Sequence, residues 1–208
     1  MAKEMVELDD SLFVGRGSKR ICYIHPHDET KCIKLDLDRK HRHTAKEIRY
    51  YKRYSRQGIL VDMIAPYHGR MKTNSGVGYV FGLARDFDGK ISRSVTYYLK
   101  TSEDEKLLND LFAGMACLKE YMIRHGITVT LLEAHNMVFQ ISHHGNGKVI
   151  LIDGIGNNQL LPMSFFLNSH ARKVVRRKWS NFEKAMMRRF SCDQKVYRIF
   201  MRLHEMVI

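Results

Sequence analysis

The sequence predicts an α+β fold in which a small antiparallel sheet carrying one helix precedes a mainly helical half. Two observations support this prediction. Strand-like segments separated by turn residues fill most of the first 85 residues, and a long amphipathic helix opens the remainder. A short strand hairpin and a basic helical tail complete the second half. We expect a single domain over residues 1–208, with its first half at 1–85 and its second half at 86–208.

The composition indicates a folded globular protein. Of its 208 residues, 44% are hydrophobic and 10% are aromatic, which is enough to bury a good-sized core. The N-terminus is charged and no apolar run approaches the ~20 residues of a membrane span, so a secreted or membrane-spanning protein is not expected. The four scattered cysteines form no CxxC pair, which argues against a disulfide framework or a cysteine zinc site. We therefore expect a cytoplasmic location.

The positive charge is concentrated at the C-terminus. The chain has a net charge of +13, and the segment from His170 to Ile208 holds eleven Lys and Arg residues against three acidic ones. Such a tail suggests a polyanionic partner, for instance an acidic protein, nucleic acid or an anionic membrane. The alternative is a solvated helix face that keeps the protein soluble. No DNA-binding motif accompanies the basic residues, which favours the solvated face.

Turn residues mark the elements of the first half. Strands are predicted at residues 7–15, 19–25, 31–37, 65–73 and 76–87. The stretch "GRGS" forms the turn between the first two strands, and "NSG" forms the hairpin turn between the last two. A helix is predicted over residues 43–58. Thr44 is a suitable cap, Glu47 follows three residues later, and Gly58 ends the helix.

A long helix is predicted to open the second half, over residues 103–126. Its leucine and methionine residues recur at spacings of three and four, which makes one apolar face. Acidic residues open it and Gly126 closes it, as helix capping favours. Strands at 136–142 and 148–154 follow as a hairpin, and a basic helical tail begins at about residue 162. Trp179 and Phe182 are expected to anchor that tail in the core.

The first half carries residues that suit a phosphate-binding site. Gly15 and Gly17 lie in a tight turn between two strands, where backbone N–H groups can approach phosphate oxygens. Lys34 lies inside an apolar strand and offers a point charge for the phosphates, and Glu47 on the next helix can hold it by an ion pair. Each has a simpler interpretation: glycines of an ordinary turn, an outward-facing lysine, and a capping-box glutamate.

The second half supplies candidate metal ligands. Asn136 begins one strand of the hairpin, and Asp153 ends the other within "VILIDGIG". An amide and a carboxylate placed in this way can give Mg²⁺ two oxygen ligands while it binds nucleotide phosphates. Asp153 with Gly154 is also a common turn pair, which is the alternative. Taken together, the order of the glycines, Lys34, Glu47, Asn136 and Asp153 predicts a kinase-like site for ATP and Mg²⁺.

The loop "TVTLLEAHNMVFQ" departs from the kinase pattern. A kinase places its catalytic Asp five residues before the Asn, and here that position holds Leu131, which cannot accept a proton. Glu133 is the only carboxylate in the loop and is a candidate base, although its position usually holds a basic residue that meets the phosphate. His135 is a second candidate base, because the unperturbed pKa of a histidine is about 6.5.

Six stretches carry a family resemblance: "GRGSKRICYIHP", "CIKLD", "KEIRYYKRY", "GYVFGLARDFDGK", "HGITVTLLEAHNMVF" and "LIDGIG". Through them, over most of residues 11–160, the chain resembles the YrbL family of PhoP regulatory network proteins, and "RDFDGK" is a particular mark of that family. The resemblance implies a minimal protein-kinase-like fold of two lobes with a hinge near Leu83 to Asp86. Only 55 residues follow Asp153, too few for the usual activation segment and a full set of C-lobe helices.

Two further departures leave the activity open. Arg20 replaces the third glycine of the loop, where it either restricts the loop or reaches a phosphate. The motif that reads Asp-Phe-Gly in kinases begins here with Asp153 and Gly154, so the Asp is present while the Phe is absent. One interpretation is an ATP-dependent phosphotransferase that acts on a protein or small-molecule hydroxyl. The other is a pseudokinase, which binds nucleotide or a partner and signals by conformation.

Overall fold

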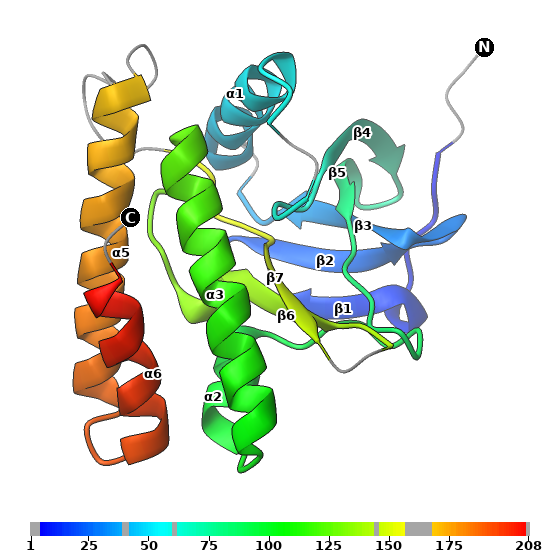
Figure 1. Cartoon of the computed structure of the whole chain (residues 1–208). Coiled ribbons are helices and arrows are strands. Elements are labelled where there is room, and N and C mark those ends of the chain that lie inside the picture. Colours follow the sequence, from blue (N-terminus) through cyan, green and yellow to red (C-terminus); the bar gives the residue numbers. More distant parts are fainter. Residues whose placement is uncertain (1–4, 39–41, 60–61, 144–145, 157–167, 207–208) are drawn as a thin grey trace.

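The computed structural model describes residues 5–38, 42–59, 62–143, 146–156 and 168–206. Figure 1 shows a five-stranded sheet with one helix on one side of the molecule and packed helices on the other, with a two-stranded hairpin between them. The α+β class predicted from the sequence is confirmed. Within these described ranges, no helix is both long enough and apolar enough to cross a membrane.

The larger sheet is antiparallel throughout. Its strands are β1 (Phe13–Arg16), β2 (Arg20–His25), β3 (Asp28–Asp36), β4 (Tyr67–Thr73) and β5 (Gly76–Gly82), in the spatial order β1-β2-β3-β5-β4. In the register of β2 and β3, Arg20 pairs with Asp36 and Cys22 with Lys34. Because paired residues and alternate residues share a face, these four side chains lie on the same side of the sheet.

The predicted strand boundaries need two corrections. The first strand does not begin at residue 7, because a 3-10 turn, η1 (Asp10–Leu12), occupies the middle of that stretch and Asp9 caps it through Ser11 N. The fifth strand ends at Gly82 and does not continue to residue 87. Beyond it, residues 83–87 leave the sheet as a crossing segment. None of them is buried, and Phe87 is 54% exposed, so the apolar residues there do not indicate a strand.

That crossing segment joins the two halves. Arg85 Nε donates to the carbonyl of Glu29 in the sheet (2.7 Å). Asp86 Oδ1 accepts bonds from Ser92 Oγ (2.7 Å) and from Ile141 N (2.9 Å), which belong to the second half. The neighbouring Arg and Asp of "RDFDGK" therefore bond one to each half, which gives this stretch a structural role.

Helix α1 (Arg42–Arg56) closely matches the predicted helix at 43–58. Thr44 was expected as its cap, but the helix begins at Arg42, so Thr44 lies within the first turn. Its Oγ1 donates to Asp36 Oδ1 (2.5 Å) and ties the start of the helix to the end of β3. On its buried face, Tyr51 packs on the sheet, where its ring meets Phe81 edge-on with centroids 5.5 Å apart. Tyr54 instead reaches the second half, where its hydroxyl accepts from Thr128 N (3.0 Å). This packing presents Glu47 toward the sheet face that carries Lys34.

The second half is built on a long helix. α3 (Glu105–His125) is capped by Asp104, whose side chain accepts from Lys106 N and Leu107 N, and it ends at Gly126 in the left-handed conformation (φ 64°). Both ends agree with the predicted helix at 103–126. The predicted hairpin forms from β6 (Met137–Ile141) and β7 (Gly147–Leu151), and β7 packs on this helix. Its strands are shorter than predicted: β6 begins after Asn136, and β7 ends two residues before Asp153. A short helix, α2 (Val95–Thr101), was not predicted.

The basic tail folds onto the second half as α5 (Asn168–Arg189) and α6 (Gln194–Glu205). The predicted tail begins at about residue 162, and its first part lies outside the described residues. Trp179 and Phe182 are buried, as expected of anchors. A buried ion cluster adds to this packing: Lys119 Nζ of α3 lies 3.0 Å from Glu183 Oε1 of α5, and His204 Nδ1 of α6 lies 2.7 Å from Glu183 Oε2.

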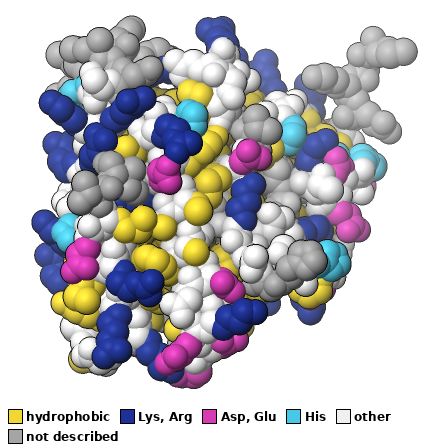
Figure 2. Space-filling model, viewed as in Figure 1, with side chains coloured by type: hydrophobic (Ala, Val, Ile, Leu, Met, Phe, Trp, Pro, Cys, Tyr) yellow, Lys and Arg dark blue, Asp and Glu magenta, His cyan; other side chains and the backbone are white. Residues whose placement is uncertain are grey.

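The basic residues of the tail line its outer surface. Figure 2 shows Lys and Arg side chains along the side of the molecule where α5 lies. On α5 the exposed basic residues are Arg172, Lys173, Arg176, Arg177, Lys184, Arg188 and Arg189. The apolar side chains of the same helix face α3 and α6. The charge concentration seen in the sequence is therefore one surface of a packed helix.

Candidate functional site

A cavity of about 1480 Å³ separates the two halves of the molecule. It is bounded by the β1–β2 turn, β3, α1, the start of the crossing segment and the loops before β6 and after β7. All eight predicted site residues line it: Gly15, Gly17, Lys34, Glu47, Glu133, His135, Asn136 and Asp153. Residues spread over more than 130 positions in sequence therefore meet at one cleft.

Gly17 lies in the turn that borders the cleft, whereas Gly15, predicted in the same turn, lies in β1 and pairs with Cys22. Neither position needs glycine for its backbone conformation. Gly17 N donates to Arg20 O (2.8 Å) and closes the turn. The backbone at Gly15 and Gly17 does not enter the positive-φ region. A Cβ atom added at Gly15 would meet nothing within 4 Å, and one at Gly17 would meet only Arg20 O at 3.8 Å. Their lack of side chains keeps space open beside the turn, as close approach of a ligand to the backbone requires.

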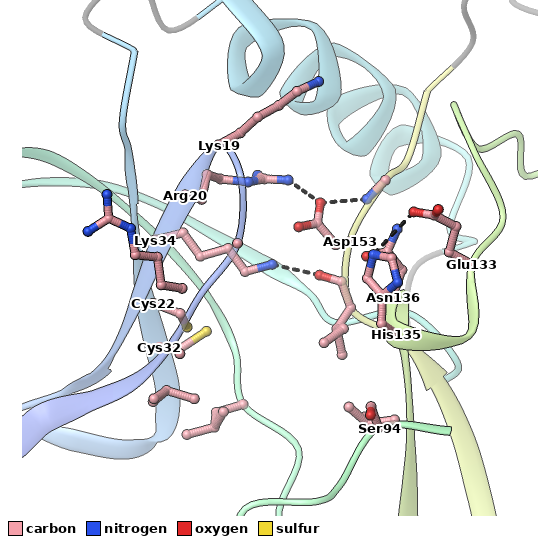
Figure 3. A pocket seen from close by; sticks show the side chains of 18 of the residues that line it. Lys19, Arg20, Cys22, Cys32, Lys34, Ser94, Glu133, His135, Asn136 and Asp153 are labelled. Carbon is pink, nitrogen blue, oxygen red and sulfur yellow. Dashed lines mark hydrogen bonds and ion pairs between the residues drawn. The ribbon is translucent and has the colours of Figure 1, made fainter. Parts of the chain in front are cut away.

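Lys34 spans the cleft from β3. Its side chain is buried, and Nζ donates to the carbonyl of Ile152 (2.6 Å) on the opposite wall (Figure 3). The ammonium also lies 4.6 Å from the centroid of the Phe81 ring, a cation–π contact. The expected ion pair between Lys34 and Glu47 is not formed in this structure, because Glu47 is held by another cation.

That cation is Arg20, at the start of β2. Its Nη1 lies 2.6 Å from Glu47 Oε2, and its Nη2 forms an ion pair with Asp153 Oδ1 (Figure 3). The Arg20 side chain is only 16% exposed. The sequence marked Arg20 only as the residue in place of a third glycine. The signal that finds it is strand alternation: Arg20 and Cys22 share a face of β2, and Cys22 pairs with Lys34.

Burial and the neighbouring charges shift the pKa values of these groups. Burial raises the pKa of Glu47, and the charge of Arg20 offsets only part of that rise. Burial also raises the pKa of Asp153, but Lys34 and Arg20 outweigh it, so that its pKa falls below the ordinary value. The two carboxylates raise the pKa of the Arg20 guanidinium further, so it stays charged. The cleft thus holds two fixed cations, Arg20 and Lys34, beside two carboxyl groups.

Asn136 and Asp153 lie together at the floor of the cleft. Ile152 N donates to Asn136 O (2.9 Å), and Gly154 N donates to Asp153 Oδ1 (2.6 Å). The φ of 84° at Gly154 favours glycine, and a Cβ there would make a tight contact of 3.3 Å with Asn136 Nδ2. The hairpin therefore brings these two predicted ligands together.

This donor set does not fit Mg²⁺ in the arrangement observed. Oδ1 of Asp153 already accepts both Gly154 N–H and the Arg20 guanidinium. A divalent cation at this carboxylate would stand against the positive charge of Arg20. Across the described parts of the chain, no group of three or more His, Cys, Asp or Glu side chains gathers as a metal site.

Two hydrogen bonds at Thr130 fix the loop that carries the candidate bases. Thr130 N donates to Gly154 O (2.8 Å), and Lys178 Nζ of α5 donates to Thr130 O. Leu131, at the position of a kinase base, is 58% exposed. Glu133 Oε2 lies 3.1 Å from His135 Nε2, so the two candidate bases are partners of each other (Figure 3).

Comparison with known proteins agrees with the resemblance seen in the sequence. The model of the family described as "PhoP regulatory network protein YrbL" matches residues 6–187. The chain belongs to this family. It is 28% identical over 181 residues to the uncharacterized protein YrbL of Escherichia coli (strain K12), with 86% of each chain covered. The same values hold for the protein of that name from Shigella flexneri.

Two cysteines of this YrbL-family chain were not predicted to belong to the site. Cys22 of β2 and Cys32 of β3 both line the cleft, and their sulfur atoms lie side by side near Lys34 (Figure 3). The hydrogen bond with Cys22 outweighs burial and lowers the pKa of the Cys32 thiol to about 7, with a further contribution from Lys34. Their ten-residue separation in sequence hides this contact, which depends on the β2–β3 register.

Proposed function

We propose that this YrbL-family chain is a kinase-like protein that binds ATP in the cleft between its halves. One observation carries the proposal: the glycine turn, Lys34, Asn136 and Asp153 converge on a single cavity of about 1480 Å³. A small antiparallel sheet with one helix on one side, and a helical half with a hairpin on the other, supports the two-lobe arrangement that the family resemblance implies. In such a fold the segment after β5 would serve as the hinge.

The charges of the cleft support a triphosphate ligand. Lys34 and Arg20 provide cations within the cavity, and the lack of side chains at Gly15 and Gly17 keeps space open beside them. Leu83 and Ala84 line the same cavity at the start of the crossing segment and offer an apolar wall for a base. ATP would thus place its phosphates toward the sheet turn and its base toward the crossing segment.

We further propose that nucleotide occupancy, not phosphoryl transfer, is the output of the site. Leu131 stands at the base position with an exposed aliphatic chain, and an aliphatic side chain cannot orient or deprotonate a hydroxyl. Both cations of the cleft already bridge the two halves, Lys34 through Ile152 O and Arg20 through Asp153. A polyanion that draws on these cations would change how the halves are held together.

Phosphotransfer to a hydroxyl is the second candidate. It is favoured by Glu133 and His135, which line the same cleft beside Asn136 and lie within 3.1 Å of each other. An imidazole that is oriented by a carboxylate can act as a general base and accept the proton of a hydroxyl. A test for transfer from labelled ATP distinguishes this candidate from the first.

Calorimetric titration with ATP tests the nucleotide proposal. Lys34→Met should weaken binding by about tenfold or more, because a charge-assisted phosphate contact is lost. The matched control is Lys31→Met on the same strand. Lys31 is three residues from Lys34 and so points to the opposite face of the sheet, where it forms an ion pair with Asp28 (2.6 Å) and does not line the cavity. Absence of ATP binding by the unmodified protein, or equal losses in the two variants, would remove the proposal.

The basic surface of α5 is proposed as the contact for an acidic partner. Seven exposed Lys and Arg residues lie on one packed helix. A helix whose opposite face is fixed in the core presents these charges as a stable array.

A further inference from the structure

The guanidinium of Arg20 contacts Asp153, the carboxylate predicted to bind a metal, and Glu47 at the same time. Both contacts lie within the cleft, and the Arg20 side chain is largely buried. Arg20 is thus fixed by two carboxylates from opposite halves of the molecule, as Figure 3 shows for its contact with Asp153.

The geometry leaves Arg20 able to bind a further anion. A guanidinium has five N–H donors, and its recorded ion pairs use Nη1 for Glu47 and Nη2 for Asp153. Each terminal nitrogen carries a second N–H group. Lys34 adds an ammonium to the same cavity. Two cations with donors in hand can neutralise phosphate oxygens in the way that a metal ion does.

A divalent cation would be disfavoured at the same carboxylate. Asp153 Oδ1 is shared by Arg20 and by Gly154 N–H, and a metal there would face the guanidinium directly. Asn136 alone is a neutral ligand and a weak one for Mg²⁺. The metal and Arg20 therefore compete for Asp153.

We infer that the cleft takes ATP free of divalent metal, with Arg20 as the cation that stands in for Mg²⁺. This inference rests on the proposed nucleotide binding and adds the chemical form of the ligand. It also assigns Arg20, which the family resemblance treats only as a departure from the glycine loop, as a nucleotide-binding residue.

Calorimetry of ATP binding in EDTA and in excess Mg²⁺ tests the inference. The unmodified protein should bind ATP in EDTA at least as tightly as in Mg²⁺. Arg20→Ala should lose about tenfold or more of its affinity in EDTA, because contacts between charged groups are lost, and Mg²⁺ should restore part of that loss. Arg70→Ala is the control, since Arg70 is an exposed arginine of β4 outside the cavity.

Removal of Arg20 alone leaves Glu47 buried without its cation, which can impair folding. The double variant Arg20→Met with Glu47→Gln removes that unpaired charge and should show the same loss in EDTA. Circular dichroism and a urea titration report whether each variant is folded. If the unmodified protein binds ATP only with Mg²⁺, or if folded Arg20 variants bind as well as it does in EDTA, the inference is wrong while the proposed function stands. If it binds ATP in neither condition, both are wrong.

Discussion

Arg20 and Asp153 form an ion pair that crosses the cleft from the first strand pair of the sheet to the end of the hairpin in the second half. Lys34 makes a parallel connection to Ile152 O, the residue before Asp153. The two contacts hold the halves together at one point, and both depend on cations that an anionic ligand would also attract. A ligand that binds to these two cations would therefore be coupled to the relative placement of the halves.

The direction in which Asp153→Asn changes ATP affinity tests the role of Asp153. If Asp153 serves as a partner for Arg20 and not as a metal ligand, its neutralisation removes a negative charge from the cleft and releases the guanidinium. ATP affinity in EDTA should then rise by about two- to tenfold, as expected for one nearby charge at partial exposure. Calorimetry measures the change, with Asp62→Asn, an exposed residue outside the cavity, as the control. A fall in affinity that is confined to Mg²⁺ buffers would instead identify Asp153 as a metal ligand.

Phosphoryl transfer should be undetectable if the site serves for occupancy. With γ-labelled ATP, release or transfer of phosphate by the unmodified protein should not exceed that of the heat-denatured protein. The physical reason is the side chain of Leu131, which provides no base, whereas a positioned base contributes about 10²–10⁴-fold. Turnover that disappears in both Glu133→Gln and His135→Ala would establish the phosphotransferase and would refute the occupancy proposal.

The thiol pair predicts a pH profile. The pKa of Cys32 is about 7, below the ordinary thiol value of 9.0, so the thiolate fraction of Cys32 increases as pH rises through 7. Alkylation of Cys32 by iodoacetamide, followed by peptide mass spectrometry, should therefore have its midpoint near neutral pH. Cys22→Ala should move this midpoint to higher pH, because the hydrogen bond that lowers the pKa is removed. Bound ATP should slow the alkylation at every pH, since both thiols line the cleft.

The buried ion cluster of the second half predicts a large loss of stability. Lys119→Met leaves Glu183 buried with only His204 beside it, and should lower the free energy of unfolding by about 3–5 kcal/mol. A urea titration measures this, and Arg198→Ala at an exposed site of α6 is the control. The pair Lys119→Met with Glu183→Gln should recover much of the loss, because no buried charge then lacks a partner. A loss below about 1 kcal/mol would mean that the pair is not buried as described.

Capping and periodicity predicted most of the elements, because both are local. Asp104 and Gly126 bound α3 close to where the sequence placed its ends, and Trp179 is buried as expected. Helix α2 was missed because seven residues make about two turns, too few to show a period. The short first strand was overextended because Asp9 and Ser11 form a local cap within an otherwise plausible strand pattern.

The residues proposed for the site line one cleft, but their pairing differs from the expected one, and Cys22 and Cys32 were not among them. The proposed residues meet at one cleft because the strands, helix and loops that carry them were placed close to where the structure has them. The partner of Glu47 was wrong, because Arg20 and Lys34 share a sheet face and spacing cannot decide which cation reaches the helix. That choice depends on the turn at Gly17 and on how the halves are placed, which are tertiary features. Pairings across the cleft are the part that a single sequence leaves open.

The basic surface of α5 predicts binding to polyanions that weakens as salt rises. Replacing Arg172, Arg176 and Arg177 with serine removes three neighbouring exposed charges and should lower the NaCl concentration that elutes the protein from a heparin column. The matched control replaces Arg49, Lys52 and Arg56 of α1 with serine, which makes the same change in net charge from an exposed surface elsewhere. An array effect requires the α5 variant to elute earlier than the α1 variant. Equal shifts would mean that retention follows net charge alone, and the solvated-face interpretation of the tail would then stand.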